Sequence, residues 1–210
     1  MTYAFRQLHG LWDPLSAMRL FVALDLDHTI RARIKRLADE LRELSPDARW
    51  VGEESFHITL KFIGNTTQEQ AEGIKAALAS IDCQSFSLQV RGYGFFPGAG
   101  APRVFWIGVQ AGETLTQLAR DIDIAMSKLN IPAESGPYHP HITLARAGSG
   151  SPRRAAKDRP NQRLRSLQQR LASIPEPDFG SITAREFFLY ESRLSPKGSI
   201  YTKLERFPLR

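Results

Sequence analysis

The protein has 210 residues, 42% of them hydrophobic and 24% charged, which is typical of one globular domain or of two small lobes that share a core. No apolar run approaches the ~20 residues that a membrane span requires, and the first residues lack the continuous apolar segment of a secretory signal. The single cysteine, Cys83, excludes an intramolecular disulfide and a zinc site made mainly of thiolates. We therefore expect a cytoplasmic protein with no membrane partner.

The chain carries a net charge of +6. A basic protein attracts polyanions, of which nucleic acid is the commonest. Much of the excess lies between Arg153 and Arg170, a stretch that fits a solvated helix face or a loop as well as a binding surface. The charge favours a nucleic-acid partner, and both interpretations of the basic stretch stay open.

The first predicted element is a buried strand over Met18–Leu26, which is short, apolar and followed by charged residues. Residues 1–17 precede it, and we interpret them as an N-terminal extension, with a tag or a misassigned start as the alternatives. Asp27 can cap a helix over Arg31–Leu44. The apolar positions that recur at helical spacing in this segment are Ile34, Leu37, Leu41 and Leu44.

An alternating segment, Phe56–Gly64, predicts a half-buried strand. The residues expected on its buried face are Phe56, Ile58, Leu60 and Phe62, and those expected on its polar face are His57, Thr59 and Lys61. A helix over Thr67–Ile81 follows, opened by a threonine.

The second half of the chain predicts a similar mixture. Strands over Phe86–Phe95 and Val104–Val109 are joined by a turn rich in Gly and Pro, which we interpret as a hairpin connection. A helix over Glu113–Leu129 comes next, and its core candidates are Leu115, Leu118, Ile122 and Leu129. The remaining expected elements are a strand over Tyr138–Ala145, a loop over 147–160, a helix over Arg163–Leu171, and strands over Ile182–Glu191 and Ile200–Phe207 around a turn at Ser195–Gly198.

Helices mingle with pairs of strands in this order rather than alternating with single strands. Such an order favours an α+β fold with antiparallel or mixed sheets and helices packed outside. We expect residues 18–210 to form one domain.

One tetrapeptide occurs twice: His57-Ile58-Thr59-Leu60 returns unchanged as His141-Ile142-Thr143-Leu144, 84 residues later. Each copy lies in strand-like sequence, where His and Thr at i and i+2 point to the same side. The repeat therefore suggests two similar lobes, each with one His and one Thr on the polar face of a strand.

Two such histidines suit acid–base catalysis. Neutral imidazole accepts a proton and imidazolium donates one near neutral pH. On opposite sides of a phosphate, one histidine can activate water while the other protonates the leaving oxygen. The hydroxyls of Thr59 and Thr143 can donate hydrogen bonds to phosphate oxygens, so the chemistry needs no metal and no cofactor.

Other interpretations compete with this one. A single strand histidine flanked by Ile is more often structural, and only the repetition favours catalysis. His139 and His141 share a strand face, as metal ligands do, but the sequence offers no matching cluster of further ligands. His9 and His28 lie outside both motifs and are expected at the surface. Tyr138 fits a core position as well as a position that stacks on a base.

The sequence resembles the two-histidine (2H) phosphoesterases, which are defined by two His-x-Thr/Ser-x motifs. Within them it is most similar to the RNA 2′,3′-cyclic phosphodiesterases, also known as 2′-5′ RNA ligases of the LigT/ThpR type. The resemblance runs from Met18 to about Phe207. Beyond the two motifs, it rests on the segments RLFVALDL, HITLKFIG, PRVFWIGV, PHITLAR and LYESRLSPKGSIY.

The resemblance implies a pseudo-symmetric bilobal fold in which two antiparallel sheets line a central cleft. It assigns His57 as proton donor to the departing 3′ oxygen and His141 as proton acceptor from water, with a 2′-phosphomonoester as product. Thr59 and Thr143 would hold the phosphate, and Arg146 would add positive charge near it. The implied partner is RNA or a nucleotide that bears a 2′,3′-cyclic phosphate.

Two alternatives remain beside hydrolysis. A module of the same fold can bind nucleotides without significant turnover. A 2′-5′ RNA ligase runs the same chemistry in reverse, which makes ligation a side activity of a hydrolase. We expect the protein to be a monomer.

Overall fold

A computed structural model describes residues 17–98, 100–147, 164–195 and 198–210. Within them the chain forms two antiparallel sheets, in accordance with the α+β prediction. The first sheet has the order β3-β1-β8-β9, with bounds Ile58–Thr66, Met18–Leu24, Glu186–Ser195 and Gly198–Pro208. The second has the order β2-β6-β5-β4-β7, with bounds Arg49–Trp50, His141–Arg146, Val104–Ala111, Phe86–Phe96 and Asp178–Ala184.

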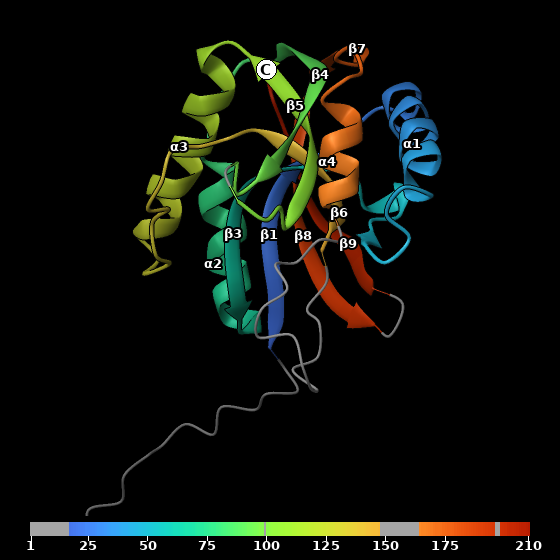
Figure 1. Ribbon diagram of the computed structural model, residues 1–210. Coiled ribbons are helices and arrows are strands. Elements are labelled where there is room, and N and C mark those ends of the chain that lie inside the picture. The colour runs from blue at the N-terminus through green and yellow to red at the C-terminus, as the bar shows by residue number, and fades with distance from the viewer. Residues whose placement is uncertain (1–16, 99, 148–163, 196–197) are drawn as a thin grey trace, which may run out of the picture.

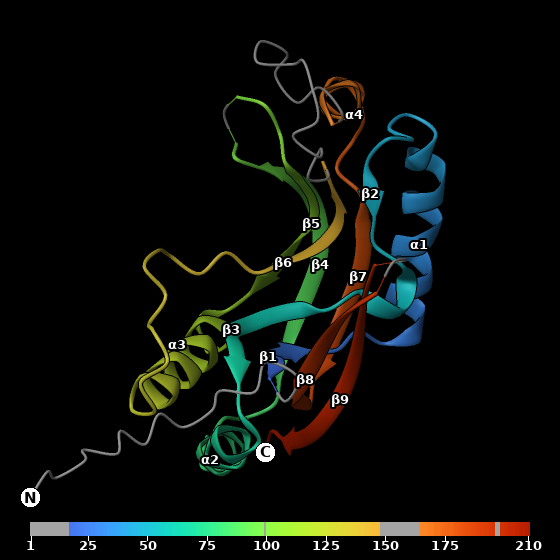
Figure 2. The same cartoon turned by 90° about the horizontal axis from the view of Figure 1, so that it is seen from below.

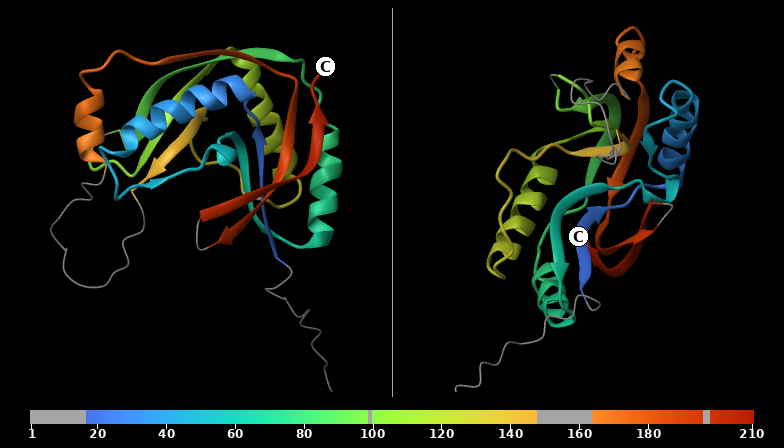
Figure 3. Two further views of the ribbon diagram at one scale, coloured as in Figure 1. Left: turned by 90° about the vertical axis from the view of Figure 1, so that its right-hand side faces the viewer. Right: turned by 60° about the horizontal axis from the view of Figure 1, so that its bottom comes forward.

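In the described part of the chain, four α-helices cover the outside of the two sheets, as expected: α1 (His28–Arg42), α2 (Gln68–Ala79), α3 (Glu113–Ser127) and α4 (Arg165–Leu171). Figures 1 and 3 show α2 and α3 on one side of the molecule and α1 and α4 on the other. Helix α1 follows a strand of the first sheet but contacts β7 of the second, and α3 follows a strand of the second but contacts β3 of the first. These exchanged contacts join the two sheets.

The predicted caps of the first two helices are confirmed, although α1 begins at His28 rather than at the predicted Arg31. The Asp27 carboxylate accepts a hydrogen bond from the backbone N–H of Ile30 at 2.8 Å. Thr67 and Gln70 form a reciprocal capping box at the start of α2. The predicted helix ends extended too far, because α1 ends at Arg42 and α3 at Ser127. Leu129, expected in the core, is therefore 37% exposed, and Leu44, expected at helical spacing, is 39% exposed.

The two sheets repeat one arrangement. Strands β3, β1, β8 and β9 correspond in order to β6, β5, β4 and β7, and β2 is an addition at the edge of the second sheet. The motif strands β3 and β6 occupy equivalent places, because β3 pairs antiparallel with β1 and β6 pairs antiparallel with the equivalent strand β5. Figure 2 shows β3 and β6 close together near the middle of the molecule, where the two strands contact each other. The two-lobe expectation is thereby confirmed.

Two strand predictions are wrong in their extent. The single strand expected over Ile182–Glu191 is two strands, β7 and β8, separated at Arg185. Strand β7 pairs with β4 in the second sheet, and β8 pairs with β1 and β9 in the first. The chain passes between the sheets here, and the continuous strand-like sequence does not reveal the change of partner. The strand expected from Tyr138 begins only at His141.

Some expectations lie outside the described residues. These include most of the proposed extension, most of the loop expected over 147–160, His9, and the first part of the basic stretch. The rest of that stretch contains α4, as expected, with Leu167 and Leu171 buried. None of the helices in the described ranges combines the length and apolar character needed to cross a membrane.

Candidate active site

Both repeated motifs line the same cavity, which has a volume of about 480 Å³. His57 lies directly before β3 and His141 is the first residue of β6. The cavity is also lined by Thr59, Thr143 and Arg146. Five of the six residues expected at the site are thus together, although they come from two different sheets.

A β-bulge interrupts both motif strands at the same residue. In β3, Thr59 pairs with Ala23 and Lys61 with Val22, which leaves Leu60 as the extra residue. In β6, Thr143 pairs with Trp106 and Ala145 with Phe105, which leaves Leu144 as the extra residue. The two backbones are therefore equivalent through the bulge.

The bulge reverses the alternation that the sequence predicts for β3. Lys61, expected on the polar face, is 2% exposed, and Phe62, expected in the core, is 55% exposed. Their equivalents in β6 are Ala145, which is buried, and Arg146, which is exposed. The same irregularity thus turns both Phe62 and Arg146 toward the cavity that they line.

The two histidines are anchored in the same way. His57 Nδ1 lies 2.7 Å from the carbonyl oxygen of Ser55, and His141 Nδ1 lies 2.7 Å from that of His139. A carbonyl oxygen has no proton to give, so each Nδ1 is the donor. Each neutral imidazole therefore carries its free lone pair on Nε2, the nitrogen that can exchange a proton during a reaction.

The surroundings of His57 are aromatic. Its ring lies 4.8 Å from that of Phe21 and meets that of Tyr201 edge-on at 5.2 Å, both measured between centroids. Burial lowers the pKa of His57 to about 4, and the Arg146 cation contributes to the lowering. The Arg31 guanidinium donates to the carbonyl oxygen of Glu53 and thereby fixes the turn that leads to the histidine.

His141 has a different set of neighbours. Its ring meets that of Phe96 edge-on at a centroid distance of 5.1 Å, and that of Trp106 lies 6.1 Å away. The indole of Trp106 lies against Gly94, where an added Cβ would come within 2.1 Å of it. Burial also lowers the pKa of His141, again with a contribution from Arg146. Both rings thus favour the neutral form in the protein alone.

Tyr138, the sixth expected residue, lines a neighbouring cavity rather than the one with both histidines. Its hydroxyl donates to the carbonyl oxygen of Thr59 at 3.0 Å, and burial raises its pKa above the ordinary value. This hydrogen bond connects the segment before the second motif to the first motif strand. A contact of Tyr138 with a base stays a prediction.

Four aromatic residues of the cavity were not expected at the site from the sequence: Phe21, Phe62, Phe96 and Tyr201. Phe62 reaches it through the bulge. Phe96 and Tyr201 lie on β4 and β9, far from either motif in the sequence. A periodic pattern contains no signal for contacts of this kind. Within the described part of the chain, no group of three or more His, Cys, Asp or Glu residues lies close enough to hold a metal ion, and metal independence stays a prediction.

Comparison with known proteins adds independent evidence. The family model described as LigT like phosphoesterase matches the chain twice, over residues 24–106 and 107–201. An RNA 2′,3′-cyclic phosphodiesterase of Archaeoglobus fulgidus is 34% identical over 90% of this chain and 99% of its own length. One of Methanothermobacter thermautotrophicus is 31% identical over 91% of this chain and 99% of its own length.

Solved structures agree with the sequence comparisons. Escherichia coli LigT complexed with 3′-AMP superposes with a TM-score of 0.73 at 28% identity, covering 92% of this chain and 98% of the other. TT0787 of Thermus thermophilus gives a TM-score of 0.72 at 30% identity with the same coverage. The paired motifs, the repeated sheets and these matches lead to one conclusion: the chain belongs to the LigT like phosphoesterase family.

Proposed function

We propose that the protein hydrolyses 2′,3′-cyclic phosphates at RNA ends to 2′-phosphomonoesters, without a metal or a cofactor. The observation that carries the proposal is the matched pair of imidazoles, His57 and His141. Both hold Nδ1 on a backbone carbonyl and line one cavity. A pair of groups that can each exchange a proton at Nε2 is what an in-line displacement at phosphorus needs.

The role of each residue follows the family resemblance. His141 accepts a proton from water, whose oxygen forms the new bond to phosphorus. The bond from phosphorus to the 3′ oxygen breaks, and His57 gives its proton to that oxygen, which leaves the phosphate on the 2′ oxygen. Thr59 and Thr143 donate hydrogen bonds to the phosphate, and the Arg146 cation offsets its charge.

The charge of the bound phosphate explains how His57 becomes protonated before it acts as the acid. Burial holds the pKa of His57 near 4 in the protein alone, whereas a proton donor must be charged when the reaction begins. A bound anion favours the imidazolium form and raises the pKa of a neighbouring histidine. We therefore propose that substrate binding protonates His57.

The relatives support the substrate class. The enzymes of A. fulgidus and M. thermautotrophicus are named RNA 2′,3′-cyclic phosphodiesterases, and LigT of E. coli was solved with 3′-AMP. By the same resemblance we propose that 2′-5′ RNA ligation is a reverse side activity. We further propose that residues 18–210 act as one bilobal domain and that the protein is a monomer. We propose a cytoplasmic location, because a protein with a single cysteine forms no intramolecular disulfide and so does not need an oxidising compartment.

Incubation with 2′,3′-cyclic AMP in the presence of EDTA tests the proposal. We expect turnover, with a product that co-migrates with a 2′-AMP standard. A predominantly 3′-AMP product would reverse the roles of the histidines or the pose of the substrate. Activity lost with EDTA and restored by zinc or manganese would refute metal independence. Binding of the nucleotide without turnover would identify a nucleotide-binding module instead.

A further inference from the structure

A second cavity of about 450 Å³ adjoins the one that holds the two histidines. The two cavities share Thr59, Phe62, Phe96 and His141 as lining residues, so they meet at the reaction site. Each is within the size range of a site for a small molecule, roughly 300–1,000 Å³. A terminal nucleotide that fills the first cavity therefore leaves a second space of similar size directly beside it.

The wall of the second cavity is a fixed structure. Lys61, whose side chain is 1% exposed, donates a hydrogen bond to the carbonyl oxygen of Pro132 at 2.6 Å and forms an ion pair with Asp123 at 2.6 Å. The backbone N–H of Glu134 donates to Asp123 at 3.2 Å. Together with the hydrogen bond from Tyr138 to Thr59, these contacts hold the segment between α3 and β6 against β3. The cavity thus exists before any ligand arrives.

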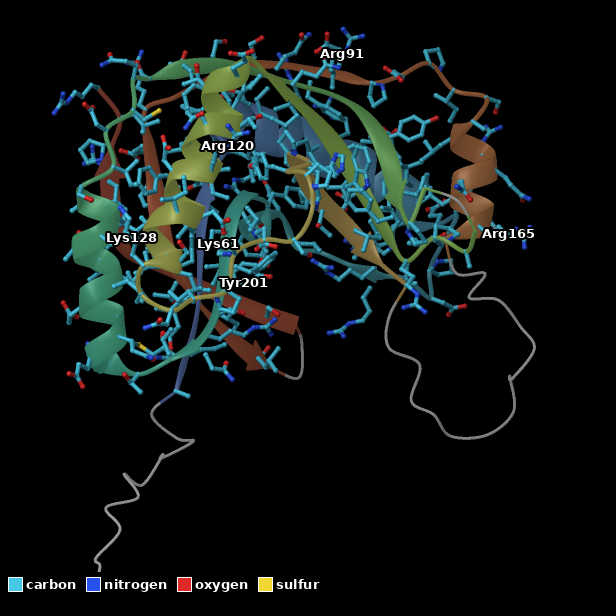
Figure 4. The ribbon with its side chains drawn as sticks, turned by 90° about the vertical axis from the view of Figure 1, so that its left-hand side faces the viewer. Lys61, Arg91, Arg120, Lys128, Arg165 and Tyr201 are labelled. Carbon is cyan, nitrogen blue, oxygen red and sulfur yellow. The ribbon has the colours of Figure 1, made fainter. Side chains whose placement is uncertain are left out.

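The charges of this cavity nearly cancel. Lys61 faces two carboxylates, Asp123 and Glu134, and this trio carries one net negative charge. Arg120, an exposed residue of α3, makes no ion pair or hydrogen bond with the described residues and adds one positive charge. Figure 4 shows Arg120 and Lys61 on the same side of the molecule, on α3 and β3. A balanced cavity suits an uncharged nucleoside better than a second phosphate.

The apolar part of the lining suits a nucleobase. Phe62 exposes 55% of its surface and comes from the first sheet, whereas Phe96 comes from the second. Exposed aromatic rings and arginine guanidinium groups are the surfaces on which single-stranded bases stack. Arg120 and Thr116, both on α3, add hydrogen-bond donors to the same space.

We propose that the second cavity binds the nucleoside that precedes the terminal nucleotide, so that the preferred substrate is an oligoribonucleotide end rather than a cyclic mononucleotide. This inference rests on the proposed function. It assigns Arg120 and Thr116 to the recognition of the penultimate nucleoside, and Phe62 to the boundary between the two nucleotides.

The test compares kcat/KM for 2′,3′-cyclic AMP with that for the dinucleotide ApA ending in a 2′,3′-cyclic phosphate. We expect the dinucleotide to be favoured by about 10-fold or more, the usual contribution of one stacked base. Arg120→Ala removes the cation and Thr116→Trp fills the space, and in each variant the ratio of the two kcat/KM values should fall toward one. Thermal unfolding verifies that Thr116→Trp is folded.

Arg91→Ala is the matched control, because Arg91 lines a third cavity, of about 330 Å³, that also borders His141. Its ratio should equal that of the unchanged protein. A ratio near one in the unchanged protein, a ratio unaffected by both α3 variants, or a ratio lowered by Arg91→Ala would overturn the inference. In those cases 2′,3′-cyclic AMP is still hydrolysed and the proposed function stands, whereas loss of turnover on both substrates would contradict the proposed function itself.

Discussion

The two motif strands have the same backbone and different surroundings. Both β3 and β6 carry a bulge at the leucine of the motif, and both histidines rest on the carbonyl oxygen two residues earlier. His57, however, packs among Phe21, Tyr190 and Tyr201, and His141 against Phe96 and Trp106. A duplicated frame can therefore present two chemically identical groups in unequal environments, which is what an acid and a base in one reaction require.

The largest expected effect is that of replacing either histidine, which tests whether both halves of the repeat take part in catalysis. His57→Ala and His141→Ala each remove one of the two proposed proton-transfer groups, and such a group is worth about 10²–10⁴-fold. We expect losses in that range in kcat for 2′,3′-cyclic AMP, with circular dichroism spectra like that of the unchanged protein. A folded single variant with near-normal turnover would show that its half of the repeat is only structural.

The two motif strands also differ in the residue that follows the bulge, and this difference predicts an effect on stability. Lys61 of β3 depends on Asp123, whereas Ala145 of β6 needs no partner. Removing one member of a buried ion pair costs about 3–5 kcal/mol, and we expect the lower end for Asp123→Ala, because Asp123 is 23% exposed. Glu134 is 57% exposed and lies 3.5 Å from Lys61, so Glu134→Ala should cost less than about 1 kcal/mol.

Urea unfolding measures both free energies of unfolding. Equal losses in the two variants would contradict the view that Asp123 is the main counter-ion of Lys61. With 2′,3′-cyclic AMP as substrate, the matched pair of variants also separates stability from catalysis, since neither carboxylate lines the cavity that contains both histidines.

The two threonines occupy equivalent positions, and their replacement tests whether the halves hold the phosphate equally. Thr59→Val and Thr143→Val remove a hydroxyl at nearly constant volume. A hydrogen bond to a charged group is worth about 1.5–3 kcal/mol, or about 10- to 100-fold. We expect losses of that size in kcat/KM, and Thr→Ser at either position should restore most of the activity. A valine variant with unchanged kcat/KM would show that this threonine does not bind the phosphate.

The smallest expected effect is the pH dependence of the free energy of unfolding that arises from protonation of His57. Burial depresses the pKa of His57 from 6.5 to about 4, so the unfolded chain takes up a proton between these pH values that the folded protein does not. The contribution of His57 to stability should therefore decrease as the pH falls through this window. NMR titration of the imidazole signals, assigned with His57→Gln, should show the low pKa and an upward shift on adding inorganic phosphate. A His57 pKa of 6.5 or above without phosphate would contradict the burial argument.

The parts of the fold that depend on local sequence could be predicted. Helical spacing and caps gave α1, α2 and α3, and the repeated tetrapeptide identified His57 and His141 together with their threonines. Each of these signals lies within one element, where periodicity and capping chemistry act.

The parts that depend on distant partners could not be predicted. The alternation of β3 assigns Lys61 to the polar face, but the bulge and the counter-ion on α3 place it inside. Phe62 is exposed for the same reason. The change of sheet at Arg185 depends on which strands accept β7 and β8. The aromatic rings around each histidine come from strands far away in the sequence, so the difference between the two histidine environments could not be predicted either.

The double variant His57→Ala/His141→Ala tests most directly whether the two histidines act as one acid–base pair. Its kcat for 2′,3′-cyclic AMP is compared with those of the two single variants under single-turnover conditions. Groups that act as a unit give non-additive losses, so the double variant should be about as slow as the slower single variant. A double variant whose loss equals the product of the two single losses would show that the histidines act independently and would contradict the paired mechanism.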